Sequence, residues 1–211
     1  MNTSSSPQPG VAAGVSIRPA LPGPPDEATI AAALQQADPE VFWALLGASA
    51  PQCLRRIIAK PGHAWSTDRA QIAELDGAPV GALIGGRVNR QEPTAPFGLP
   101  STLVRLRFFA ARMALKPLHA FLSQLDRDAW YVNAVAVTAN ARGRGVGRAL
   151  LRDAIGRARD SGASSFVLHV NASNTSAIRL YEDEGLSITD TWAPWYLAAQ
   201  VKVHRMQMRL R

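Results

Sequence analysis

The sequence predicts a mixed α/β fold in which an antiparallel hairpin and a parallel strand pair belong to one sheet. Two apolar, strand-like runs, Ala70–Leu75 and Pro79–Val88, are joined at Asp76-Gly77, a strong hairpin signal because Gly accepts positive φ without steric cost. Gly145–Ser161 has apolar residues at helical spacing and lies between two β-rich runs, so those strands must run parallel with a right-handed crossover. A chain of 211 residues with 47% hydrophobic content is long enough for one well-packed domain and short for two.

The chain begins with a small, polar, Pro/Gly-rich run over residues 1–14. It lacks the basic start and the long apolar segment of a secretory signal peptide, so we expect a disordered tail followed by one domain over residues 15–211. Val15–Pro19 reads as a short first strand, and Pro25–Leu46 as one or two helices, with Pro39 in the first turn of the second.

Residues 89–129 follow the hairpin and predict a helical insertion. Leu103–Leu115 and Leu118–Leu125 have helical character. A connection of about forty residues is much longer than usual between strands, and long insertions of this kind often act as lids over functional sites.

A central strand is expected at Trp130–Val137, which is rich in β-forming residues. Simple alternation predicts that Val132, Ala134 and Ala136 share one face, and that Asn133, Val135 and Val137 share the other.

The later elements follow in the order helix, strand, helix and two strands. The helix at Gly145–Ser161 ends at Gly162, a C-terminal cap. The remaining elements are expected at Ser165–Val170, Thr175–Glu184, Leu186–Trp192 and Val201–Leu210.

The glycine-rich loop Arg142–Gly147 lies between a strand end and a helix start. Unpaired backbone N–H groups and the positive end of the helix dipole meet there, which favours an anion such as pyrophosphate; a turn without a ligand is the alternative. A Walker loop would need Lys followed by Ser or Thr where Leu150 and Leu151 stand, and a dinucleotide fingerprint would need an acid where Val167 stands. Neither nucleotide motif fits.

The stretch Val135–Leu151 resembles the acetyl-CoA signature of the GNAT superfamily of N-acetyltransferases, whose core is R/Q-x-x-G-x-G/A. Arg142, Gly145 and Gly147 supply that core. Ala139 stands where the family often has Pro.

A second GNAT signature, N-x-x-A/S-x-x-x-Y-x-x-x-G-F, matches Asn174, Ala177, Tyr181 and Gly185, with Leu186 in place of Phe. Asn174 and Tyr181 are two helical turns apart and therefore lie on one helix face. The bland alternative for Tyr181 is a core aromatic with a satisfied hydroxyl.

The resemblance implies the GNAT fold: a central mixed, mostly antiparallel twisted sheet with helices on both faces and one parallel strand pair splayed to bind acyl-coenzyme A. It implies direct transfer of an acetyl group from acetyl-CoA to an amine in a ternary complex, with Tyr181 as the catalytic acid and no metal. The residues that the resemblance assigns to the cofactor are Val135, Ala136, Val137, Arg142, Gly143, Arg144, Gly145, Val146, Gly147, Arg148, Asn174 and Tyr181.

The general base is not evident from the sequence. Some relatives carry a carboxylate on the strand before the glycine loop, where this chain has Tyr131 and Asn133, neither of which is a good base at neutral pH. Glu74, His169 and Asp190 are substitutes that equally fit structural roles. A non-catalytic acyl-CoA-binding or sensing module is therefore the alternative function.

The formal charge of +7 suits nucleic acid, an anionic membrane or a phosphorylated ligand. No nucleic-acid-binding motif and no apolar run of roughly 20 residues is present, so we expect neither partner. The single cysteine, Cys53, cannot form an internal disulfide, which fits a cytoplasmic protein. We expect an amine substrate on a small molecule or peptide, shaped by the insertion and the aromatics Trp192, Trp195 and Tyr196; these aromatics fit core or homodimer contacts equally well.

Overall fold

The computed structural model describes residues 14–37, 39–88, 102–193 and 202–210. Within these residues, seven strands form one sheet in the order β1-β2-β3-β4-β5-β7-β6, and every neighbouring pair is antiparallel except β4 and β5. The predicted mixed, mostly antiparallel sheet with one parallel pair is confirmed. The strands are β1 (Val15–Pro19), β2 (Ala70–Leu75), β3 (Ala78–Arg87), β4 (Ala129–Val137), β5 (Ser165–Asn171), β6 (Ser187–Trp192) and β7 (Val203–Arg209).

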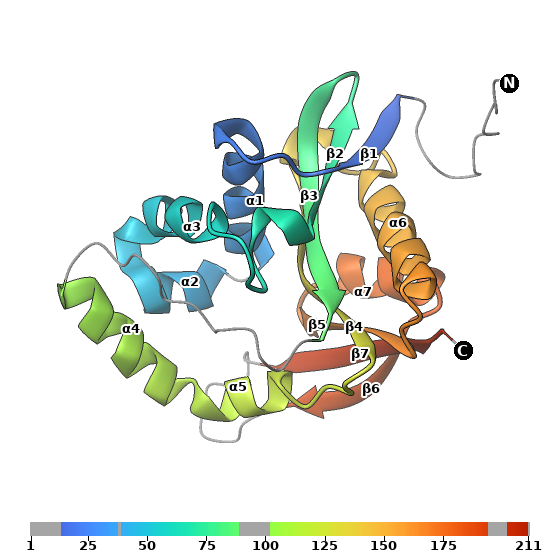
Figure 1. Cartoon of the computed structure of the whole chain (residues 1–211). Helices are drawn as coiled ribbons and strands as arrows, with labels where there is room; N and C mark the ends of the chain where they lie inside the picture. The colour runs from blue at the N-terminus through green and yellow to red at the C-terminus, as the bar shows by residue number, and fades with distance from the viewer. Residues whose placement is uncertain (1–13, 38, 89–101, 194–201, 211) are drawn as a thin grey trace, which may run out of the picture.

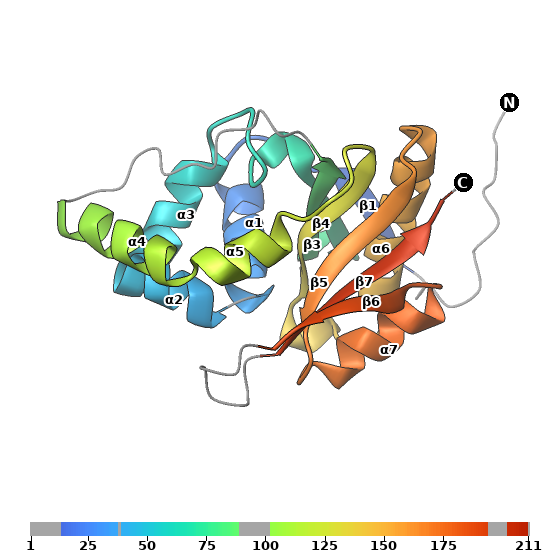
Figure 2. The ribbon, with the colours of Figure 1, turned by 90° about the horizontal axis from the view of Figure 1, so that it is seen from below.

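Helices cover both faces of the sheet, as Figures 1 and 2 show. Each face has its own cluster of buried apolar side chains. The helix α3 was not predicted from the sequence. One face carries α1 (Pro24–Ala37), α2 (Pro39–Leu46), α3 (Ala50–Ile58), α4 (Thr102–Ala114) and α5 (Lys116–Leu122), and the other carries α6 (Val146–Asp160) and α7 (Thr175–Asp183).

The turn between β2 and β3 follows the sequence prediction. Asp76 and Gly77 have φ values of 53° and 80°, the positive pair that a two-residue type I′ hairpin requires. The turn therefore sets the antiparallel register of β2 against β3.

The predicted insertion contains α4 and α5, while its residues 89–101 lie outside the described residues. The Arg107 guanidinium anchors α4 to the C-terminal end of α2 by donating to the carbonyls of Trp43 and Ala44 at 2.8 and 3.0 Å. No helix among the described residues is long and apolar enough to cross a membrane. Nearly all of the predicted N-terminal tail, residues 1–13, also lies outside the described part.

A β-bulge in β4 corrects the predicted strand faces. Val132 and Ala134 pair with consecutive residues of β3, so Asn133 between them is an extra residue. Such a bulge bends its strand and re-aims the side chains beyond it. Val132 and Val135 therefore pack on the α6 side, whereas Ala134 and Ala136 pack on the α1 side. The predicted common face for Val132, Ala134 and Ala136 is wrong for this reason.

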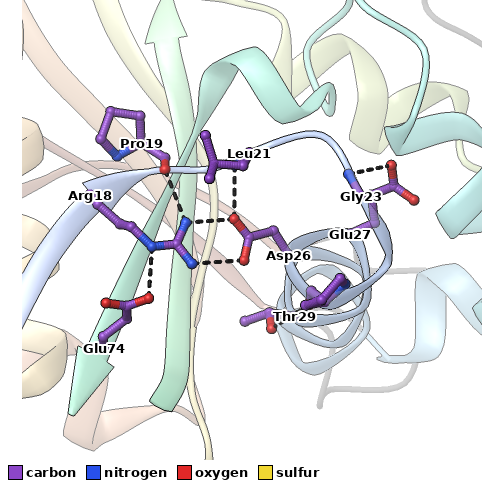
Figure 3. A network of polar contacts seen from close by, with 9 residues as sticks. Arg18, Pro19, Leu21, Gly23, Asp26, Glu27, Thr29 and Glu74 are labelled. Atoms are coloured by element: carbon purple, nitrogen blue, oxygen red, sulfur yellow. Dashed lines mark hydrogen bonds and ion pairs between the residues drawn. The ribbon is translucent and has the colours of Figure 1, made fainter. Parts of the chain in front are cut away.

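A buried carboxylate ties the first strand to the first helix. Asp26, in the first turn of α1, is 4% exposed and accepts hydrogen bonds from the Arg18 guanidinium at 2.6 and 3.0 Å and from the Leu21 N–H at 2.8 Å. Figure 3 shows Arg18 between Asp26 and Glu74 of β2, whose carboxylate accepts from Nε at 2.7 Å. One guanidinium thus joins β1, β2 and α1.

This network couples stability to pH. The hydrogen bonds from Arg18 hold the pKa of Asp26 below its ordinary value of 3.8. A carboxylate whose pKa is lower in the folded protein than in the unfolded chain stabilises the fold above the unfolded pKa, and that contribution is lost as pH falls through the folded pKa.

We expect Asp26→Asn to lower the free energy of unfolding at pH 7 by about 2 kcal/mol, since partial exposure of Arg18 weakens the pair relative to a fully buried one. The difference from the parent protein should be full above pH about 5 and shrink as pH falls below 3.8. Urea unfolding of the parent protein and of the variant, at pH 7 and at a pH below 3.8, measures this difference. Asp68→Asn, at an exposed position, is the matched control. A penalty that is the same at pH 7 and at low pH would contradict the ion-pair explanation.

Candidate functional site

A gap opens in the sheet where β4 and β5 part. The two strands pair only over Ala129–Val132 and Ser165–Leu168. Beyond that point β4 continues along β3, and β5 continues along β7. Within the described part of the chain, the far half of β4 therefore has a neighbouring strand on one side only.

The backbone of β4 presents N–H groups to this gap that have no acceptor among the described residues. Thr138 N–H donates to the Val80 carbonyl at 2.8 Å, which fixes the alternation of the β3–β4 ladder. Because an antiparallel ladder bonds every second residue, the N–H groups of Val135 and Val137 point away from β3 and into the gap. They are placed to pair with an extended molecule as another strand would.

The N-terminus of α6 lies at the open end of the gap. Gly145 is its N-cap residue with φ 76° and supplies no capping side chain, and its carbonyl accepts the first helical bond from Ala149 at 3.0 Å. Within the described chain, nothing accepts from the N–H groups of Val146, Gly147 and Arg148. These donors and the helix dipole form a site for an anion.

These elements enclose a cleft of about 690 Å³ between β4, the glycine loop and α7. Of the residues assigned to the cofactor from the sequence, all line this cleft except Arg144. Five further residues line it that were not assigned to the cofactor from the sequence, although Ala177 belongs to the second signature: Gln36, Ala141, Ser176, Ala177 and Leu180.

The sequence carries a signal for some of these further residues and none for others. Ala177 and Leu180 precede Tyr181 by four and one positions, so the helical period of the second signature carries a signal for Ala177. Gln36 is at the end of α1 and reaches the cleft only through tertiary packing. No local pattern marks it.

Two arginines of the site are held by neighbours. Arg142 donates from Nε to the Val137 carbonyl at 3.1 Å and from Nη2 to Gln36 at 3.3 Å. Arg148 pairs with Asp183 at 2.6 Å and with Glu184 at 3.3 Å. These contacts orient positive charge along the cleft and fasten α6 to the end of α7.

The two polar residues of the second signature have distinct positions. The Asn174 carboxamide oxygen caps α7, accepting from the Ala177 N–H at 3.2 Å and from the Ser176 hydroxyl at 3.1 Å. Tyr181 is 7% exposed and lines the cleft, and burial raises its pKa to about 12. Its phenol therefore stays protonated near neutral pH and is able to donate a proton.

The candidate bases fall into two groups. Glu74, on β2, forms an ion pair with Arg18 and is remote in the sheet order from the β4–β5 gap. The Asn133 carboxamide donates to the Ala64 carbonyl at 3.3 Å. His169, Tyr131 and Asp190 instead belong to one cluster next to the point where β4 and β5 part.

In that cluster, His169 Nδ1 lies 3.1 Å from the Tyr131 hydroxyl. Burial, and secondarily the charge of Arg205, lowers the pKa of His169 to about 4, while Asp190 opposes the shift. The imidazole is therefore neutral near pH 7 but too weakly basic to hold a proton taken from an amine. Of the terminal aromatics, Trp192 ends β6, while Trp195 and Tyr196 lie outside the described residues.

A family model for the acetyltransferase (GNAT) family matches residues 40–186. No curated protein matches the chain in sequence.

Solved structures resemble it in fold. An N-acetyltransferase from Staphylococcus aureus Mu50 is similar with a TM-score of 0.61 and 16% identity, over 92% of this chain and 100% of that one. The ribosomal-protein-S18-alanine N-acetyltransferase from Escherichia coli gives 0.56 and 18%, over 93% and 94%. The Salmonella typhimurium protein yncA, solved with its cofactor acetyl-CoA, gives 0.53 and 19%, over 94% and 95%.

Proposed function

Because the chain belongs to the GNAT family of acetyltransferases and its activity is acetyl-CoA-dependent acetylation, we propose that it acetylates a primary amine of a small molecule, protein or peptide. The amine attacks the thioester directly in a ternary complex. The observation that carries the proposal is the cleft that joins the unpaired β4 backbone to the free N-terminus of α6. Residues 15–211 act in this proposal as one cytoplasmic domain with an insertion at about 89–129. A non-catalytic binding module gains no support from the comparisons.

The two ends of the cleft differ chemically, and this difference sets the direction in which the cofactor lies. The pyrophosphate lies against the N–H groups of Val146, Gly147 and Arg148, which are the strongest anion donors there. The pantetheine then follows β4 from Val137 past Val135, pairing with their N–H groups. This path carries the thioester toward the closed end of the gap, beside the Asn133 bulge.

Gly147→Ala tests the phosphate site. A Cβ at this position meets Leu180 Cδ2 at 3.5 Å and Val137 Cγ2 at 3.8 Å, which are ordinary contacts, so the fold tolerates it. The added methyl group obstructs the approach of a phosphate to the helix N-terminus, and we expect acetyl-CoA affinity, measured by isothermal titration calorimetry, to fall by at least about tenfold, or about 1.4 kcal/mol.

Gly156→Ala is the matched control on the same helix, because a Cβ there meets no atom within 4 Å. It should leave acetyl-CoA affinity unchanged and stabilise the protein by about 0.5–1 kcal/mol. Parent-like affinity in Gly147→Ala would remove the α6 N-terminus from the cofactor site.

Tyr181 supplies the proton that the departing thiolate needs. Its hydroxyl makes no hydrogen bond with the described residues, its ring lines the cleft opposite β4, and its raised pKa keeps it protonated. A developing thiolate is a strong base compared with the bound thioester, so proton transfer from a phenol stabilises the transition state selectively.

Tyr181→Phe should lower kcat by about 100-fold while acetyl-CoA affinity and the melting temperature stay near those of the parent protein, because the ring is retained. Steady-state kinetics from pH 6 to 9 measure the effect. Turnover that is unchanged across this range would remove Tyr181 as the acid.

The acceptor is expected from the face that carries α1–α5. There, α5 and the segment at Ala64 flank the closed end of the gap, where Asn133 contacts Ala64 and Phe121 contacts Arg205. A panel of amines, polyamines, amino acids and peptides, screened for acetyl-CoA-dependent thiol release, identifies the class. We expect at least one primary amine to be turned over; acetyl-CoA binding without thiol release for every amine would favour the non-catalytic module.

A further inference from the structure

Four polar side chains form a row across adjacent strands at the closed end of the gap. Tyr131 is on β4, His169 on β5, Arg205 on β7 and Asp190 on β6, and the ladder pairs His169 with Arg205 and Arg205 with Asp190. Their strand neighbours Val132, Leu168 and Met206 pack on the α6 side, so by strand alternation the row faces α5.

Arg205, the third residue of this row, is held in place by its neighbours. Its side chain is 13% exposed and donates from Nη2 to the Phe121 carbonyl at 2.7 Å. Its guanidinium stacks on the Phe121 ring, 4.7 Å from the centroid, and Nη1 lies 3.4 Å from Asp190. Helix α5 therefore holds the guanidinium in place on the sheet.

This arrangement decides the tautomer of His169. A guanidinium has donors only, and Arg205 Nε lies 3.4 Å from His169 Nε2, so Nε2 must present its lone pair. A neutral imidazole then carries its proton on Nδ1, and Nδ1 donates to the Tyr131 oxygen at 3.1 Å. The low pKa of His169 keeps this neutral form throughout the neutral pH range.

Tyr131 is thus held by a directed chain from Arg205 through His169. It stands two residues before the Asn133 bulge, in the last stretch of β4 that still pairs with β5. A pantetheine that follows β4 from Val137 brings its thioester to this end of the gap. The Tyr131 side chain lies on the acceptor face there.

We propose that the Tyr131 hydroxyl binds and orients the attacking amine, and that His169 and Arg205 are positioning residues that aim it. The proposal rests on the proposed function. The Tyr131 oxygen accepts an N–H of the amine, leaving the nitrogen lone pair toward the thioester carbon. The C–N bond forms, the C–S bond breaks, Tyr181 protonates the thiolate, the surplus amine proton leaves to water, and water returns a proton to the Tyr181 phenolate. His169 takes no proton, because Nδ1 already carries one and the Nε2 lone pair faces the Arg205 guanidinium.

Kinetics with the amine of highest kcat/KM in the panel test this hydrogen-bonded arrangement of Arg205, His169 and Tyr131. We expect Tyr131→Phe and His169→Leu each to lower kcat/KM for the amine by about tenfold, the loss of one oriented hydrogen bond, with the acetyl-CoA Kd unchanged. Because His169 acts through Tyr131, the double variant should be no worse than Tyr131→Phe alone. His169→Asn, whose Nδ2 replaces the Nδ1 donor, should return to within about threefold of the parent.

One control variant and two contradicting outcomes complete the kinetic test of Tyr131 and His169. His204→Leu, a matched substitution on the β7 residue next to Arg205, should leave amine kinetics unchanged. Effects of Tyr131→Phe and His169→Leu that multiply in the double variant would show that His169 does not act through Tyr131. Parent-like amine kinetics in Tyr131→Phe, with normal cofactor binding, would refute the inference alone, whereas a parent protein that does not bind acetyl-CoA would refute the proposed function.

The tautomer is testable without any acceptor. Nitrogen-15 NMR of the histidine-labelled full chain, with His169→Leu used for assignment, should show His169 neutral and protonated on Nδ1 from pH 6 to 9. The groups facing it are Tyr131 from β4, Arg205 from β7 and Asp190 from β6, with the uncharged Phe121 from α5. A proton on Nε2, or a charged imidazolium near pH 7, would contradict the proposed hydrogen bonds from Arg205 through His169 to Tyr131.

Discussion

The parting of β4 and β5 after four paired residues is the constraint on which the rest of the site depends. Backbone groups in a sheet must be paired or solvated. The half of β4 that pairs with β3 but not with β5 therefore offers N–H groups on its open side to an extended ligand. The crossover between the same two strands is α6, and its N-terminus therefore begins beside the gap that the strands leave. Anion site and strand-like edge are two consequences of one topological event.

The Asn133 bulge changes the face of the sheet on which alternate β4 side chains lie. Before the bulge Tyr131 lies on the α5 side, and after it Val135 and Val137 pack toward α6. The proposed cofactor cleft and the proposed acceptor face therefore meet at the same few residues of β4. In the proposed function, helix α5 completes the acceptor face through Arg205, and the long connection between β3 and β4 then has a chemical role as well as a packing one.

Local signals explain what the sequence predicted well. Asp76-Gly77 dictated its turn because few residues accept positive φ twice in succession. Arg142, Gly145 and Gly147 are close in sequence, and all three line the same cleft. The bulge was missed because it depends on β3 pairing, which simple alternation ignores. Arg205 was missed because only the β5–β7 pairing, between segments distant in the chain, brings it to His169. Residues whose role is set by a distant partner carry no local pattern.

Amide hydrogen exchange of the full chain, with and without acetyl-CoA, tests most directly that the β4 edge and the α6 N-terminus hold the cofactor. Bound acetyl-CoA should slow exchange at Val135, Val137 and Val146–Arg148, whose N–H groups have no acceptor among the described residues. It should leave exchange in the β2–β3 hairpin unchanged. Exchange at these five amides that is equally fast with saturating acetyl-CoA would show that the cofactor binds elsewhere.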